Sequence, residues 1–222
     1  MSRPPVVILV RHGESQHHVL GLTGGWTDTP LTQLGEKQAR LVAARLRREL
    51  GDAPVRVVTS DLVRAAQTAE AIAAAFGVTA ELDDRLREHN NGEAANLTHD
   101  EARARWPEWY GEPLPLDTVI YPGSETARAF FERCAGFIDD LVYDGRTPIV
   151  VTHGGTLNCL IARWLGFPVE VLEPIGFEFH TASITVVRDA PYPRLERLND
   201  TGHLTELEGQ VPLRQLLPRP AA

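Results

Sequence analysis

Three short apolar runs alternate with helix-type segments along this chain, and this alternation limits the fold more than any other feature. The runs are residues 6–10, 55–59 and 148–152, and most of their residues are apolar. Continuous apolar strands are typical of a sheet that is covered on both faces. Strands that alternate with helices favour a parallel sheet between two helical layers. We therefore expect an α/β fold, a three-layer sandwich with a mostly parallel central sheet flanked by helices.

Helical periodicity and stop signals place the other elements. Residues 32–50 carry apolar side chains at helical spacing, and Gly51 follows as a stop. We expect further helices over residues 62–76, over 98–106 behind a capping box at Thr98, over 124–141 with Ser124 as the cap, and over 155–165. Later strands are expected at 177–180, 183–188 and 194–199. With no repeat and no boundary signal, we expect one domain over residues 1–222 with a mobile tail from about residue 212.

The overall charge restricts the partners of the protein. The 222 residues carry a formal net charge of -8, which argues against broad binding to nucleic acid or to an anionic membrane surface. No apolar run approaches the ~20 residues needed to cross a bilayer. The two cysteines, Cys134 and Cys159, are expected to be buried free thiols, so we expect a cytoplasmic protein. A small anionic ligand stays compatible with the net charge, because a few arginines in one pocket decide the local field.

Charged and imidazole side chains follow the ends of the three apolar runs. Arg11 and His12 follow the first, Arg64 comes one short turn into the helix after the second, and His153 follows the third. Ligands bind at the carboxyl ends of parallel strands, where these side chains would converge. Arginine forks and free amides at helix starts bind phosphate oxygens. The sequence therefore predicts a site for a phosphate dianion.

A histidine beside such a phosphate can attack the phosphorus as a neutral imidazole and form a phosphohistidine. We assign this attack to His12 and the donation of a proton to the leaving oxygen to Glu88, whose protonated form a nearby dianion favours. Taken alone, the candidates have structural alternatives: Arg11 could be a surface ion-pair residue, His153 a satisfied core histidine, Arg64 a solvated helix residue and Glu88 a surface carboxylate. A zinc site is also conceivable, but its candidate ligands lack the spacing typical of zinc sites; they are His12, His17, His18 and His153. We expect no metal and no cofactor.

At this point the chain resembles a known family, the histidine phosphatase superfamily, which includes the cofactor-dependent phosphoglycerate mutases. Six segments carry the resemblance in the family's order, over about residues 6–204: R-H-G-E-S at 11–15, G-W-T-D-T-P-L-T at 25–32, S-D-L-V-R-A-A-Q-T-A at 60–69, P-G-S-E-T at 122–126, T-H-G-G at 152–155 and N-D-T-G-H-L at 199–204. One such motif is weak evidence, whereas six in order are strong.

The resemblance implies a role for each candidate residue. His12 would be the phosphorylated nucleophile, and Arg11, Arg64 and His153 would hold the phosphoryl group. Glu88 would be the proton donor and then the base that activates water, with Glu93 as a nearby competitor for this role. Substrate contacts are expected at four positions: His18, Gly24, Gly25 and Gly154. Two positions depart from the family pattern, since His18 stands where Asn is frequent and Leu22 where Arg is frequent.

Three functions are compatible with these residues. A phosphomonoesterase that acts on a small phosphorylated metabolite is preferred, because the last signature ends in Gly155 where mutases usually carry Asn. The segment between Glu88 and Pro122 also holds only two arginines, Arg103 and Arg105, and no adjacent basic pair. A phosphoglycerate mutase is the second hypothesis, and a non-catalytic module that binds phosphorylated ligands is the third. Four aromatic residues of this segment are expected to form loop core in preference to stacking on a leaving group: Trp106, Trp109, Tyr110 and Tyr121.

Overall fold

A computed structural model describes residues 3–109, 114–172, 176–189 and 191–205. Within these ranges, six strands form one sheet in the order β3-β2-β4-β1-β5-β6. β1 and β2 are each parallel to β4, and β3 is parallel to β2, whereas β5 and β6 are added antiparallel at the other edge. The strands are β1 Val6–Arg11, β2 Val55–Thr59, β3 Ala80–Leu82, β4 Thr147–Thr152, β5 Ile184–Arg188 and β6 Arg194–Asp200.

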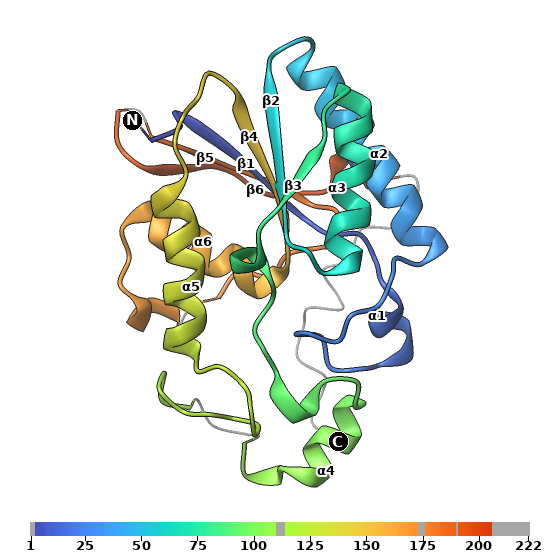
Figure 1. The fold of residues 1–222 in the computed structure, drawn as a ribbon, viewed down its shortest axis with the longest axis vertical. Coiled ribbons are helices and arrows are strands. Elements are labelled where there is room, and N and C mark those ends of the chain that lie inside the picture. Colours follow the sequence, from blue (N-terminus) through green and yellow to red (C-terminus); the bar gives the residue numbers. More distant parts are fainter. Residues whose placement is uncertain (1–2, 110–113, 173–175, 190, 206–222) are drawn as a thin grey trace, which may run out of the picture.

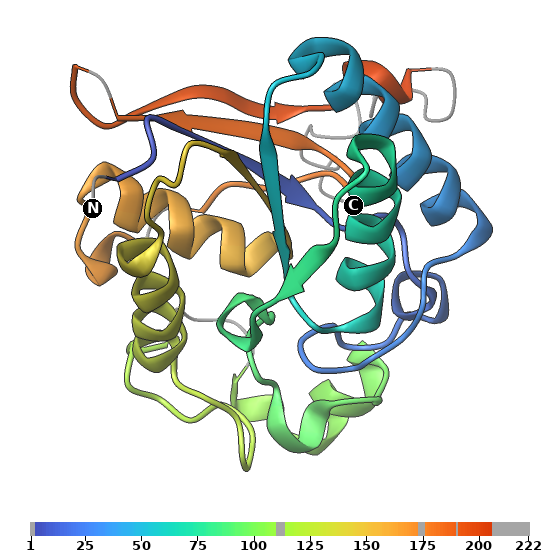
Figure 2. The same cartoon turned by 45° about the horizontal axis from the view of Figure 1, so that its top comes forward.

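Helices cover both faces of this sheet, as the sequence predicts (Figure 1). The helices are α1 Gln16–Leu20, α2 Gln33–Leu50, α3 Val63–Phe76, α4 His99–Arg105, α5 Ala127–Asp140 and α6 Gly154–Leu165. The described ranges also contain five short 3-10 segments, three between helices and two after α6: η1 Asp84–Leu86, η2 Gly92–Ala94, η3 Pro107–Trp109, η4 Val169–Leu172 and η5 Gly202–Leu204. Figure 2 shows α5 and α6 together on one face and α2 and α3 on the other. The expected three-layer sandwich is confirmed.

Alternate residues of β1 explain why the apolar run is continuous. Val7 and Leu9 pack into the core beneath α5 and α6, whereas Ile8 and Val10 pack into the core beneath α2 and α3. All four side chains are buried. Because successive side chains of a strand point to opposite faces, a strand between two helical layers needs apolar residues at every position.

Most predicted helix starts are correct, and one is wrong. Thr32 and Thr98 cap α2 and α4 through their side chains, as expected. Ser124 does not cap α5, because Thr126 accepts the amide N–H of Ala129 and the helix begins at Ala127. The Ser124 hydroxyl instead accepts the N–H of Tyr121 and closes a turn.

The strand expected at residues 177–180 is also wrong. No strand of the described ranges pairs with this segment, and side chains from other parts of the chain bind its backbone groups instead. Asn158 on α6 accepts the Phe177 N–H at 2.7 Å and donates to the Phe177 carbonyl at 2.9 Å. Asn199 accepts the His180 N–H at 2.8 Å. The segment therefore lies as a braced loop beside the carboxyl end of β1.

The remaining expectations concern the first helix, the aromatic residues of the loop and the tail. α1 was not predicted, and it follows the end of β1 directly. Trp106 and Tyr121 pack together at 5.1 Å between ring centroids, in a small core with Ala94 and Ala102, which agrees with a loop core. The Trp109 side chain, Tyr110 and the tail from residue 212 lie outside the described residues. Within the described ranges, every helix is too short or too polar to span a bilayer.

Candidate active site

Two buried histidines meet where β1 and β4 end. Arg11 pairs with Thr152 in the parallel register of these strands, so the next residue of each strand, His12 and His153, lie side by side. Their ring centroids are 5.0 Å apart, and both side chains are almost completely buried. The His12 N–H also donates to the Thr152 carbonyl at 2.9 Å, which extends the pairing by one residue.

His12 has the protonation state of a nucleophile. Its Nδ1 lies 2.7 Å from the Gly13 carbonyl, which accepts hydrogen bonds only, so Nδ1 carries the proton and Nε2 carries the lone pair. Burial lowers the pKa of His12 well below its ordinary value, and the cationic Arg64 and nearby His153 and Arg11 lower it further. The imidazole is therefore neutral at neutral pH.

Arg64 faces this lone pair from the first turn of α3. Its Nε lies 3.3 Å from His12 Nε2, and its two terminal nitrogens donate to the Thr27 carbonyl at 2.9 Å and the Gly25 carbonyl at 2.7 Å. Burial lowers the pKa of Arg64 to about 10, which leaves the guanidinium charged at neutral pH. The loop that carries Gly25 thus fixes a buried cation against His12.

Arg11 supplies a second cation to the same region. One terminal nitrogen donates to the Phe179 carbonyl in the braced loop, and the other lies 3.1 Å from His18 Nε2. Its Nε is buried and has no hydrogen-bond partner among the described residues. The nearby carboxylate of Glu88 opposes the fall in pKa that burial causes in both Arg11 and Arg64. The site is therefore strongly cationic and holds unfilled donor capacity.

His153 also presents an unpaired nitrogen. The Ser60 hydroxyl accepts the Leu62 N–H at 3.2 Å and lies 2.9 Å from His153 Nε2. The Ser60 hydroxyl keeps one proton that it can donate to Nε2; the proton of the neutral imidazole is then on Nδ1, which has no partner in the described part of the chain. Burial lowers the pKa of His153 well below its ordinary value. Ser60, to which the sequence assigned no role, is therefore the side chain that faces Nε2 of this ring; its one signal in the sequence is its place directly after β2.

Glu88 lies across the site on an irregular segment between η1 and η2. Its Oε2 accepts the Gly155 N–H at 2.9 Å, at the start of α6, and its Oε1 accepts the His89 N–H at 2.8 Å. Glu93, the competitor for the role of proton donor, instead pairs with Arg105 at 2.9 Å and is half exposed. The structure thus brings Glu88 to the strand ends and holds Glu93 in a surface ion pair.

The four expected substrate-contact positions all border this region. His18 is stacked on His12, with 5.6 Å between ring centroids. Gly25 has a left-handed backbone and has no room for a Cβ against Asn91, while a Cβ on Gly154 would lie 3.8 Å from Arg11 Nε. A Cβ on Gly24 would lie 3.6 Å from Nε2 of His17, whose pKa is lowered to about 3 by burial and by His18. His17 entered the sequence analysis only as a zinc candidate.

The ring nitrogens of His18 both face donors. The Ser15 N–H donates to Nδ1 at 3.1 Å, so the proton of the neutral ring sits on Nε2. That Nε2 lies 3.1 Å from a terminal nitrogen of Arg11, which can only donate. Two donors therefore converge with no acceptor between them. Burial and the charge of Arg11 lower the pKa of His18 to about 4, so this arrangement persists at neutral pH.

A metal centre has little support in this geometry. Across the described ranges, histidine, cysteine, aspartate and glutamate side chains nowhere form a group of three or more that could hold a metal ion. The four zinc candidates of the sequence analysis lie near one another, but their ring nitrogens face arginines, serine hydroxyls and backbone groups. Cys134 and Cys159 are buried free thiols beneath α5 and α6.

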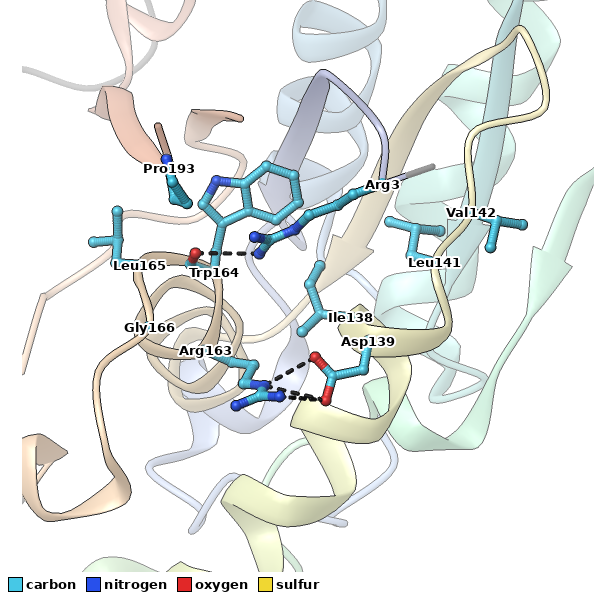
Figure 3. A pocket seen from close by; sticks show the side chains of 10 residues that line it. All are labelled: Arg3, Ile138, Asp139, Leu141, Val142, Arg163, Trp164, Leu165, Gly166 and Pro193. Carbon is cyan, nitrogen blue, oxygen red and sulfur yellow. Dashed lines mark hydrogen bonds and ion pairs between the residues drawn. The ribbon is translucent and has the colours of Figure 1, made fainter. Parts of the chain in front are cut away.

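A hollow of about 480 Å³ lies at the other end of the sheet, beside the start of β1 (Figure 3). Arg3 lies 3.7 Å from the ring centroid of Trp164 and donates to its carbonyl at 3.1 Å. Arg163 is paired with Asp139 through two nitrogens, each at 2.8 Å from a carboxylate oxygen. Both arginines that line this hollow already have partners, so it is not a phosphate site of the kind found at the strand ends.

Two neutral histidines and two arginines thus gather at the ends of the parallel strands of an α/β sheet, and together they indicate the class of protein to which the chain belongs. The family model of the histidine phosphatase superfamily (branch 1) matches residues 7–201, and the chain belongs to this superfamily.

Individual relatives include both mutase and phosphatase names. The probable phosphoglycerate mutase GpmB of Yersinia pestis is 31% identical over 205 residues, which cover 89% of this chain and 94% of the relative. A mycobacterial glucosyl-3-phosphoglycerate phosphatase of known structure is 28% identical with a TM-score of 0.75, covering 89% of this chain and 100% of that chain. The alpha-ribazole phosphatase of Shigella flexneri is 26% identical with a TM-score of 0.75, covering 88% and 96%. The fold therefore matches those of phosphatases over most of the chain.

Proposed function

We propose that this protein is a phosphomonoesterase that hydrolyses a small phosphorylated metabolite through a phosphohistidine on His12. The observation that carries the proposal is the state of His12, a buried neutral imidazole whose Nε2 lone pair faces Arg64 at 3.3 Å. A lone pair beside a fixed cation attacks an electrophile that brings its own negative charge, and a phosphoryl group is such an electrophile.

The reaction has two steps. In the first, His12 Nε2 forms a bond to phosphorus, the bond from phosphorus to the ester oxygen breaks, and Glu88 gives that oxygen a proton. In the second, the Glu88 carboxylate takes a proton from water, the water oxygen attacks phosphorus, and the bond from phosphorus to nitrogen breaks. Arg11, Arg64 and His153 Nδ1 donate to the equatorial oxygens in both steps, with no metal ion required.

His18 adds a donor to the same phosphoryl group. Its Nε2–H and the facing guanidinium nitrogen of Arg11 are 3.1 Å apart, and both need an acceptor that lies beside the pair, within hydrogen-bond distance of each nitrogen. A phosphoryl oxygen placed there accepts from both donors. A histidine in this position therefore offers the phosphoryl group an N–H donor, as the amide of an Asn side chain also can.

Hydrolysis is preferred to mutase activity on two observations. Leu22 stands where relatives frequently have Arg, and its backbone pairs with Thr98, so it offers no cation to a second anionic group of a substrate. A side chain on Gly155 would displace the Glu88 carboxylate from its observed position, whereas the mutase form of this motif carries Asn. The structural relatives named above as phosphatases support the same choice.

The test measures phosphate release against isomer exchange. Purified protein with excess chelator is given an aryl phosphate, and separately 3-phosphoglycerate with a bisphosphoglycerate primer. We expect turnover of the aryl phosphate in chelator and slow isomer exchange. Complete loss of turnover in chelator would contradict the metal-free mechanism. Fast exchange with little free phosphate would establish the mutase, and binding of phosphate with no turnover of any phosphate ester would establish a binding module.

A further inference from the structure

The segment that carries Glu88 is irregular, yet side chains from other elements hold each of four successive carbonyl groups. Thr152 on β4 donates to the Leu86 carbonyl at 2.6 Å, and Thr156 on α6 donates to the Arg87 carbonyl at 2.9 Å. The Glu88 carbonyl accepts the indole N–H of Trp26 at 2.8 Å. Connecting segments are usually more mobile than the helices and strands that they join, so we ask why this segment is held by so many hydrogen bonds.

One side chain, Arg133 on α5, makes most of the remaining bonds. Its Nη1 donates to the carbonyls of Arg85 at 2.9 Å and Arg87 at 3.0 Å, and its Nη2 donates to the carbonyl of Glu88 at 3.1 Å. A planar guanidinium can reach three carbonyls at once, because its donors are spread in a rigid fork. An ammonium group has donors on one atom only and cannot span the same distance.

Glu125 holds this guanidinium in place. Its carboxylate accepts from Arg133 Nη2 at 2.5 Å and from Arg133 Nε at 3.2 Å. The same carboxylate accepts the Asn90 N–H at 2.8 Å, and the Asn90 carbonyl accepts the Glu125 N–H at 3.2 Å. Glu125 belongs to the P-G-S-E-T motif, which has no part in the phosphoryl site itself. The pair is largely buried, with 20% and 15% of the two side chains exposed, so it is shielded from solvent screening.

We propose that Arg133 is a positioning residue that holds the backbone of Glu88, and that Glu125 is its counter-ion. The proposal rests on the proposed role of Glu88 as proton donor. Arg133 acts through geometry: without its fork, the carbonyls of Arg85, Arg87 and Glu88 lose a common partner, and the Glu88 carboxylate no longer has one position relative to the leaving oxygen. Misplacement of a catalytic group by about 1 Å is enough to cost a large part of the rate.

The test uses leaving groups of different acidity. A nitrophenolate leaves without a proton, whereas an alkoxide needs one, so loss of a well-placed acid slows alkyl esters selectively. We compare kcat/KM, which includes only the steps up to release of the alcohol, for para-nitrophenyl phosphate and β-glycerophosphate. For Arg133→Met and Arg133→Lys we expect the alkyl ester to lose roughly tenfold more than the aryl ester. The lysine variant, which keeps the charge, is expected to be as selective as the methionine variant.

Controls separate this proposal from the proposed function. Arg163→Met removes another arginine that is paired with a carboxylate on a neighbouring helix, and it should leave both esters unchanged. Glu88→Gln should show the same selective loss as the Arg133 variants. If Arg133→Lys loses equally on both esters, or keeps full activity, the positioning role of Arg133 is overturned. The assignment of Glu88 as the proton donor still stands in that case, provided that Glu88→Gln loses selectively on the alkyl ester. A Glu88→Gln protein without selectivity would remove the acid assignment itself. If Arg133→Met does not fold, as judged by thermal melting, Arg133→Lys alone decides.

Discussion

His18 is the residue at which this chain departs most informatively from its family pattern. Its tautomer is set by the Ser15 N–H, which leaves Nε2–H as the donor beside Arg11. An amide side chain has a donor at a similar place and no tautomer to fix. The histidine presents a comparable donor because the backbone N–H of Ser15, at the start of its own helix, binds the other ring nitrogen.

This comparison gives a prediction for two substitutions. His18→Leu removes the donor, and we expect KM for an aryl phosphate and the inhibition constant of inorganic phosphate to rise roughly tenfold or more, because a hydrogen bond to a charged oxygen is lost. His18→Asn keeps a donor and should stay within about threefold of wild type. Steady-state kinetics with phosphate as the competing inhibitor measure both. Equal constants for the Leu and Asn variants would show that His18 does not contact the phosphoryl group.

Glu88 and Glu93 show what residue-level reading of the sequence can and cannot decide. Glu88 lies in an irregular stretch and Glu93 in the three-residue η2, so periodicity assigns neither side chain to a face. The strand ends point to Arg11, His12 and His153 because parallel strands share one edge. The choice between the carboxylates depends on residues elsewhere in the chain. The Gly155 N–H binds Glu88, and Arg105 pairs with Glu93. Such distant partners leave no local signal.

At the scale of elements, the start of α6 is built around the Glu88 carboxylate. The Gly155 N–H binds Oε2, and a Cβ on Gly155 would overlap Oε1 and lie 3.3 Å from Oε2. The helix therefore begins with two glycines because its first turn approaches another side chain, although glycine weakens a helix.

Gly155→Ala should displace this carboxylate while the helix stays intact. We expect kcat/KM for an alkyl phosphate to fall about tenfold or more, with little change in the free energy of unfolding, since only a flexible side-chain end must move. The matched control is Gly136→Ala in α5, where a Cβ meets nothing within 4 Å. That variant should keep its activity and gain about 0.5–1 kcal/mol of stability. Wild-type rates in Gly155→Ala would mean that Glu88 does not act from its observed position.

Element prediction from sequence succeeds where the signal is local. β1, β2 and β4 are predicted because two-sided burial requires continuous apolar residues, and α2 and α4 because Thr32 and Thr98 cap them. It fails at residues 177–180, where Asn158 and Asn199 bind a segment that no strand pairs. It also places the start of α5 two residues too early, since serine and threonine are both good caps and the fold uses the second.

At the scale of the whole molecule, the site makes stability depend on pH. The pKa values of His12 and His153 lie well below their ordinary value, and that of His17 is lowered to about 3. Below the unfolded pKa of about 6.5, the unfolded chain binds protons that the folded chain does not. The contribution of these histidines to the free energy of unfolding is therefore largest above that pH, and it decreases as the pH falls.

Urea unfolding between about pH 7 and pH 5 should show this decrease. Each fully buried histidine contributes up to about 1.4 kcal/mol per pH unit in this window, in which ordinary carboxyl groups stay ionised. His17→Asn removes one of the titrating groups and should make the dependence shallower. Stability that is constant over this range, or that rises as the pH falls, would show that the histidines are not buried in neutral form.

The central claim is the covalent intermediate on His12, and the direct measurement is to trap it. The protein is mixed with an aryl phosphate, quenched in alkali, in which phosphohistidine survives, digested and analysed by mass spectrometry. We expect phosphate on Nε2 of His12, in the peptide that contains this residue. We expect none in His12→Ala, which should also lose turnover. Turnover with no phosphorylated peptide, or with the phosphate on another residue, would contradict the account, as would a His12→Ala protein that keeps a rate near wild type.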